Sequence, residues 1–238
     1  MANHLSPSAP RISVNDLALF MVSSDTARFG IIRRAKSPQK PPIIRYRDVR
    51  GPICEYLASG TRNVNPLISA ESMFQHRGTD SSLSALMQDD ARNSIEVIRG
   101  IQRMQNQLGQ YAFSRAPERQ PKLTIEGLEI SIRADLLVSG TNRRGEAMVG
   151  AAVLRMTQSG ETSESALFKR REMGLYVATL AKAHVEQNLA QGLQPSNNLC
   201  MSIDVQHGDV FCAPVSATRR MNDLMNACRF IVALWPQA

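Results

Sequence analysis

The sequence predicts an α/β (α+β) fold in which a helical N-terminal segment precedes a mixed sheet flanked by helices. Two observations indicate this. Apolar residues recur every three to four positions up to about residue 111, as in amphipathic helices, and at every second position after Pro121, as in strands. From residue 84 onward we expect the order α-β-β-β-α-β-β-α, in which the second helix is a crossover connection.

Three segments are expected along the chain: a disordered tail over residues 1–12, a basic and mainly helical extension over 13–83, and the main domain over 84–238. The tail is rich in proline and serine, which do not favour regular structure. Ser13 and Asp16 then have the spacing of a capping box, so a short helix is predicted to begin there.

Further helices are predicted over residues 25–35, 45–57 and 84–111, where apolar residues keep the helical spacing. The prolines at positions 38, 41 and 42 require an extended link between the first two of these helices. Segment 67–78 gives no clear pattern.

The strand spacing predicts a hairpin of residues 123–125 with 128–138, then a polar loop over 140–145 and a buried strand over 147–156. Asp135 lies in the apolar end of the second strand. An aspartate at such a position is informative because this residue type is depleted in strands.

A long helix is predicted from Ser163 or Ser165 to about Gln191, where Gly192 ends it. A second hairpin follows over residues 199–213. The chain then closes with a helix whose apolar stripe extends to Trp235.

No stretch of the sequence reaches the roughly 18 consecutive apolar residues of a membrane span. The first residues also lack the apolar core of a secretory signal. We therefore expect a cytoplasmic protein without a membrane partner.

Positive charge is concentrated near the start of the chain. The net charge is +7, and the first 50 residues hold nine Lys or Arg against three Asp. This predicts contact with nucleic-acid phosphates, with an acidic protein partner or a plain solvated surface as the alternatives. The candidate phosphate contacts are Arg33, Arg34, Lys36, Lys40, Arg45, Arg47, Arg143 and Arg144.

The stretch Arg133-Ala-Asp-Leu-Leu-Val138, followed by the apolar strand Val149–Arg155, resembles the PD-(D/E)XK nuclease superfamily, which has the restriction-endonuclease-like fold. The similarity covers roughly residues 84 to 235. It is closest to the RecB- and Cas4-like branch, whose Gln-x-x-x-Tyr motif corresponds here to Glu172 and Tyr176, with Glu in place of Gln. The segment from Ser13 to Leu17 is also similar to the start of such proteins.

The resemblance implies a magnesium site, which needs carboxylate ligands and a lysine that orients water and offsets phosphate charge. Asp135 would be the first metal ligand if the protein is active. Ala151, Ala152 and Val153 stand where the family has Glu-x-Lys, so the second carboxylate and the lysine are missing. We therefore expect no cofactor, or Mg²⁺ only if activity survives, and we interpret Asp135, Glu172 and Tyr176 as remnants of the site.

Other interpretations of these residues stay open. A migrated site would use carboxylates of Glu96 or Glu172 and cations of Lys169 or Arg155. Asp135 would alternatively be a structural residue, paired with Arg133 or with an arginine of the 143–144 loop, and Tyr176 a core residue.

The four cysteines, Cys54, Cys200, Cys212 and Cys228, show no C-x-x-C pair and are expected to be reduced thiols. Some related nucleases hold an iron–sulfur cluster with four cysteines. The long spacings of the late cysteines here disfavour such a cluster.

The sequence thus favours a pseudo-enzyme, a nuclease-like protein that binds nucleic acid, DNA included, or is a subunit of a nucleic-acid-processing or defence assembly. One alternative is a divergent Mg²⁺-dependent DNA endonuclease or exonuclease with a migrated active site. Another is a protein-interaction scaffold that does not bind nucleic acid. The sequence does not determine the oligomeric state.

Overall fold

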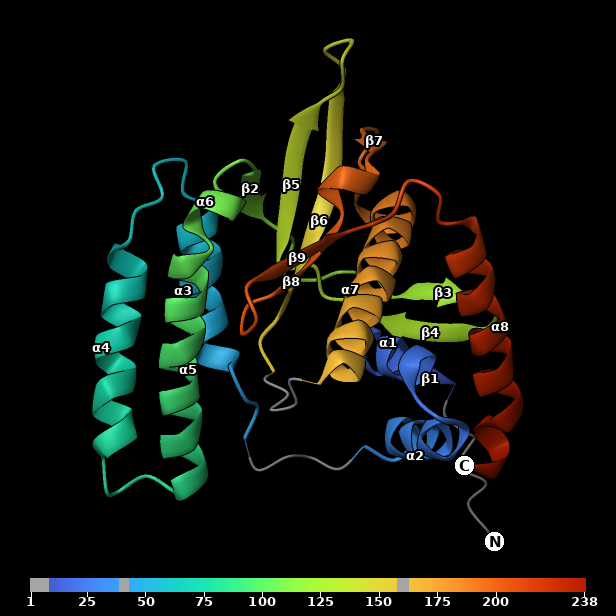
Figure 1. Ribbon diagram of the computed structural model, residues 1–238, viewed down its shortest axis with the longest axis horizontal. Helices are drawn as coiled ribbons and strands as arrows, with labels where there is room; N and C mark the ends of the chain where they lie inside the picture. Colours follow the sequence, from blue (N-terminus) through green and yellow to red (C-terminus); the bar gives the residue numbers. More distant parts are fainter. Residues whose placement is uncertain (1–8, 39–42, 158–162) are drawn as a thin grey trace, which may run out of the picture.

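The computed structural model of this 238-residue chain describes residues 9–38, 43–157 and 163–238. It confirms a mixed α/β architecture in which helices cover both faces of a central sheet (Figure 1). Among the helices of the described ranges, none has the length and apolar character that a bilayer crossing requires.

The main sheet, as far as the chain is described, has six strands. Five of them follow one another in chain order, and the short β7 pairs with β6. The neighbouring strands are antiparallel except that β6 runs parallel to both β7 and β8, because α7 carries the chain back across the sheet after β6. The strands are β2 (Ala112–Arg115), β5 (Leu136–Thr141), β6 (Ala147–Arg155), β7 (Gln194–Pro195), β8 (Met201–Asp204) and β9 (Asp209–Cys212).

The predicted hairpin of residues 123–125 with 128–138 is wrong in its second strand, because part of that strand belongs to a second, small sheet. The predicted strand 128–138 is broken at residues 132–135, because β4 pairs with β3 and β1 whereas β5 pairs with β2 and β6. The two halves of the predicted strand therefore belong to different sheets. The strands of the small sheet are β1 (Arg11–Ser13), β3 (Leu123–Ile125) and β4 (Leu128–Ser131).

One group of helices covers the first face of the main sheet (Figure 1). Its apolar side chains share a buried core with Leu136, Ala152 and Leu154 of the sheet. The group consists of α3 (Arg47–Ala58), α4 (Asn65–Thr79), α5 (Ala85–Arg103) and α6 (Gln105–Leu108). The unassigned segment 67–78 is thus a helix, and the predicted helix 84–111 is interrupted at Met104.

The second face is covered by α7, and the small sheet and three further helices lie beyond it (Figure 1). These elements share a second core that includes Leu17, Val177 and Ile231. The helices are α1 (Val14–Val22), α2 (Asp25–Lys36), α7 (Glu164–His184) and α8 (Thr218–Leu234). The helix predicted to reach residue 191 continues from α7 as a π-helical turn, Val185–Leu189.

The predicted helical extension is divided between the two cores. α1 and α2 pack with α7 and α8, whereas α3 and α4 pack with α5. Arg11 and Ile12 of the expected tail belong to β1, and residues 1–8 lie outside the described residues. The domain boundary at residue 84 stays a prediction.

Candidate functional site

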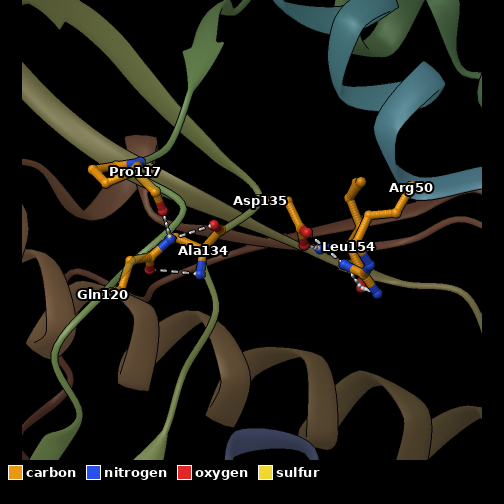
Figure 2. A network of polar contacts seen from close by, with 6 residues as sticks. All are labelled: Arg50, Pro117, Gln120, Ala134, Asp135 and Leu154. Atoms are coloured by element: carbon orange, nitrogen blue, oxygen red, sulfur yellow. Dashed lines mark hydrogen bonds and ion pairs between the residues drawn. The ribbon is translucent and has the colours of Figure 1, made fainter. Parts of the chain in front are cut away.

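Asp135 lies at the bend that leads into β5, just before the strand and not inside it. Its backbone N–H donates to the carbonyl of Ala152, 2.9 Å away. Its carboxylate accepts two hydrogen bonds, one from Nη1 of Arg50 at 2.5 Å and one from the backbone N–H of Leu154 at 2.7 Å. The side chain is 1% exposed, so both oxygens are bound inside the protein (Figure 2).

Arg50 reaches Asp135 from the first turn of α3, and sequence reasoning missed this partner. The expected partners of Asp135, Arg133 or an arginine of the 143–144 loop, were wrong. Arg50 also donates to the carbonyl of Leu154 at 3.4 Å. In the sequence Arg50 is one of the nine basic residues among the first 50 positions, and no local pattern connects it with Asp135, which lies 85 positions away.

The other side of the bend is held by Gln120. Its Oε1 accepts from the N–H of Ala134 at 3.0 Å, and its Nε2 donates to the carbonyls of Ala134 and Pro117, each at 2.8 Å (Figure 2). Nε2 of His184 lies 3.1 Å from the same Oε1. Gln120 and Arg50 thus fix the backbone and the side chain on opposite sides of the bend that carries Asp135.

The neighbouring strand offers Asp135 no charged partner at the positions of the expected Glu-x-Lys. Ala151, Ala152 and Val153 are each at most 3% exposed, and their side chains lie in the cores. Within residues 9–38, 43–157 and 163–238, no three His, Cys, Asp or Glu side chains gather as a metal-binding group.

A second buried ion pair lies at the same end of the sheet, where β6 and β8 both end. Arg155 and Asp204 are register partners, and Nη1 of Arg155 lies 3.7 Å from Oδ2 of Asp204. Nδ1 of His207 lies 2.8 Å from the other carboxylate oxygen. Burial lowers the pKa of Arg155, the charge of Asp204 raises it, and that of Arg170 lowers it further.

Asp204 was not among the predicted site residues, although its signal resembles that of Asp135. Each is a single aspartate beside an apolar strand segment, Asp135 just before β5 and Asp204 as the last residue of β8, and both are paired with an arginine. The sequence suggests Arg155 only as a cation of a migrated site. The structure places it beside Asp204, on the strand that also binds Asp135.

Glu172 and Tyr176 lie together on α7, as their spacing predicts. Nη1 of Arg220 on α8 lies 3.0 Å from Glu172, and its guanidinium stacks 4.3 Å from the centre of the Tyr176 ring. Burial raises the pKa of Tyr176, and the charge of Arg220 opposes this. The contacts of this pair therefore run to α8, whereas those of Asp135 run to α3 and β6.

In the described part of the chain, no contact brings Glu96 or Lys169 of the predicted migrated site to Asp135. Glu96 pairs with Arg99 on the solvent side of α5 and is 53% exposed. Lys169 is exposed in the second turn of α7.

The candidate phosphate-binding residues are spread over three places. Arg33 and Arg34 are exposed on α2, and Nζ of Lys36 on the same helix donates to the carbonyl of Pro236 at 3.1 Å. Lys40 lies outside the described residues. Arg45 and Arg47, near the start of α3, pair with Asp89 and Asp48 but stay 44% and 70% exposed. Arg143 and Arg144 lie at the tip of the β5–β6 hairpin, at the opposite end from α2 (Figure 1).

The cysteines are free thiols, three buried and Cys212 partly buried. Burial raises the pKa of Cys54 and Cys228 to about 12 and that of Cys200 to about 11. Such thiols stay protonated at neutral pH, so they fill the core instead of acting as nucleophiles.

Comparisons with known proteins give no further identification. No protein-family model matches the sequence, and no curated protein matches it.

Proposed function

We propose that this chain is a nuclease-like protein that has lost catalysis and binds nucleic acid, alone or as a subunit of a nucleic-acid-processing or defence assembly. The elements of its main sheet and its flanking helices support this. Apart from α6 and the short β7, they follow the order α5-β2-β5-β6-α7-β8-β9-α8, which has the same succession of element types as the α-β-β-β-α-β-β-α order predicted from residue 84 onward, with β2 in place of the predicted strand 123–125. Asp135 precedes the second strand of that core.

The observation that carries the proposal is the state of the Asp135 carboxylate. A catalytic Mg²⁺ needs carboxylate oxygens that are free to coordinate it, usually from more than one residue. Both oxygens of Asp135 are already bound by Arg50 and by the backbone of Leu154. The guanidinium of Arg50 therefore supplies the positive charge that a metal ion would bring.

Binding to nucleic acid is supported by exposed arginines on α2 and near the start of α3. Arg33 and Arg34 project from α2, and Arg45 and Arg47 stay largely exposed near the start of α3 although each has an acidic neighbour. Exposed ion pairs are weak, so these arginines can exchange a carboxylate for a phosphate at a small cost. A polyanion that releases counterions is the partner that such a surface favours.

The test is the salt dependence of binding to a labelled oligonucleotide, measured by fluorescence anisotropy. We expect affinity to fall steeply between low and moderate salt, with a slope near −0.9 per phosphate contact on duplex DNA. Replacing Arg33 and Arg34 together by alanine should make the slope shallower. Replacing Arg229, an exposed arginine of α8 paired with Glu126, should not change it. Absent or salt-insensitive binding would contradict the proposal and favour a protein scaffold.

A further inference from the structure

The second turn of α7 exposes two large apolar side chains to solvent. Leu167 is 52% exposed and Phe168 is 64% exposed, whereas most large apolar residues of the chain are buried. Neither is needed to start the helix, because Ser163 caps it by accepting from the N–H of Ala166 at 3.3 Å. An exposed phenylalanine beside an exposed leucine is a surface that a partner can cover.

Two basic side chains and one acidic side chain lie beside this pair, the acidic one being the exposed Glu164 in the first turn of α7. Lys169 and Arg171 are exposed, and Arg171 follows Phe168 by three residues and Leu167 by four, so the three share one face of α7. The charge of Glu172, on the next turn, is balanced by Arg220. We call Leu167, Phe168, Lys169 and Arg171 the α7 platform.

The α7 platform adjoins the end of the sheet that holds the candidate site. Arg170, within the same turn, is buried on the inner side of the helix, close enough to Arg155 for its charge to lower the pKa of that residue. Arg155 follows Leu154, the residue whose backbone binds Asp135. The α7 platform and the Asp135–Arg50 pair therefore lie at the same end of the sheet, although α7 and α3 cover opposite faces of it.

We infer that the α7 platform binds single-stranded nucleic acid, with a base stacked on Phe168 and neighbouring phosphates at Lys169 and Arg171. The inference rests on the proposed function and specifies its ligand. An exposed aromatic ring beside two cations fits a strand whose bases are unpaired, because bases inside a duplex are stacked on each other and do not reach a side chain. The positive charge of the platform favours a polyanion over an apolar protein surface.

The test compares binding of a labelled oligothymidylate with binding of a labelled hairpin duplex. Phe168→Ala should weaken oligothymidylate binding about tenfold, since loss of one stacked base has an effect of this order, and should leave duplex binding unchanged. Phe168→Tyr keeps an aromatic face and should bind like the wild type. Phe230→Ala is the matched control, because Phe230 is 51% exposed on α8.

The outcomes separate this inference from the proposed function. If the wild type binds neither probe, the proposed function fails, and this inference with it. Two results would refute only the α7 platform. In one, Phe168→Ala binds oligothymidylate as tightly as the wild type does. In the other, its affinity for oligothymidylate and for the duplex falls by the same factor. Melting curves should show every variant folded. The double variant Lys169→Gln and Arg171→Gln is the second test: it should weaken oligothymidylate binding and lower its salt dependence, and unchanged binding would count against the platform.

Discussion

At the scale of single residues, the Asp135–Arg50 pair joins the N-terminal helices to the sheet. Removing a carboxylate from water costs several kcal/mol unless charge and hydrogen bonds compensate for it. Here the compensation comes from one guanidinium and one backbone N–H. The pair is therefore a point where a small change in sequence should have a large effect on stability.

Arg50→Ala leaves the Asp135 carboxylate buried without its cation. We expect the free energy of unfolding to fall by about 3 kcal/mol, measured by urea denaturation. In an Asp135→Asn background the same change should cost much less, because no charge remains to be balanced. Arg99→Ala, which removes exposed ion pairs with Glu71 and Glu96, should cost less than about 1 kcal/mol. If Arg50→Ala and Arg99→Ala lowered the free energy of unfolding equally, the buried pair would contribute no more to stability than an exposed one.

The burial of His184 predicts how the stability of the protein depends on pH. It is fully buried between Gln120 and Asn188, and burial lowers its pKa. Since the folded chain holds His184 neutral, its contribution is complete above the unfolded pKa of about 6.5 and is lost as the pH falls through the lower folded value.

Denaturation from about pH 7.5 to about pH 5.5 measures this contribution, which changes by at most about 1.4 kcal/mol per pH unit. The wild type should lose more stability over this range than His184→Gln, because the two proteins share every other titrating group. Parallel pH profiles for the two proteins would refute the role of His184.

At the scale of elements, close packing of α7 on β9 sets the position of the helix. Gly174 is buried in α7, and a Cβ placed there would lie 2.2 Å from the ring of Phe211. No other residue type leaves room for that ring. The same helix carries Tyr176 and the α7 platform, so its position decides where both lie relative to the sheet.

Gly174→Ala should therefore lower the free energy of unfolding by about 1–3 kcal/mol, because the ring or the helix must move. Gly30→Ala is the matched control within α2, where the nearest atom to the new Cβ is 4.0 Å away. It should raise stability by about 0.5–1 kcal/mol through lower entropy of the unfolded chain. Equal effects of the two changes in chemical denaturation would contradict this packing.

At the scale of the whole molecule, the sequence predicts the elements better than their association. The apolar run of β6 and the stripe of α8 are local signals, and the structure has both elements. The break at residues 132–135 was not predictable, because it depends on Gln120 and on pairing between β1 and β4, which are distant in sequence.

In the candidate site, too, the local signals were predictable and the association of distant residues was not. Asp135 was recognisable from its apolar neighbours, and the apolar third strand was recognisable from its composition. The partner Arg50 was not, because the pairing arises only when α3 packs on the sheet. Asp204 had a local signal, a lone aspartate ending an apolar strand, that was overlooked.

Metal-dependent cleavage is the most direct test of the central claim, that Arg50 and the backbone of Leu154 occupy the Asp135 carboxylate so that no catalytic metal binds there. Supercoiled plasmid and labelled single strands are incubated with the wild type and with Asp135→Asn, each with Mg²⁺ or Mn²⁺. We expect both substrates to stay intact with both proteins. Cleavage by the wild type that disappears in Asp135→Asn would show an active nuclease and contradict the account.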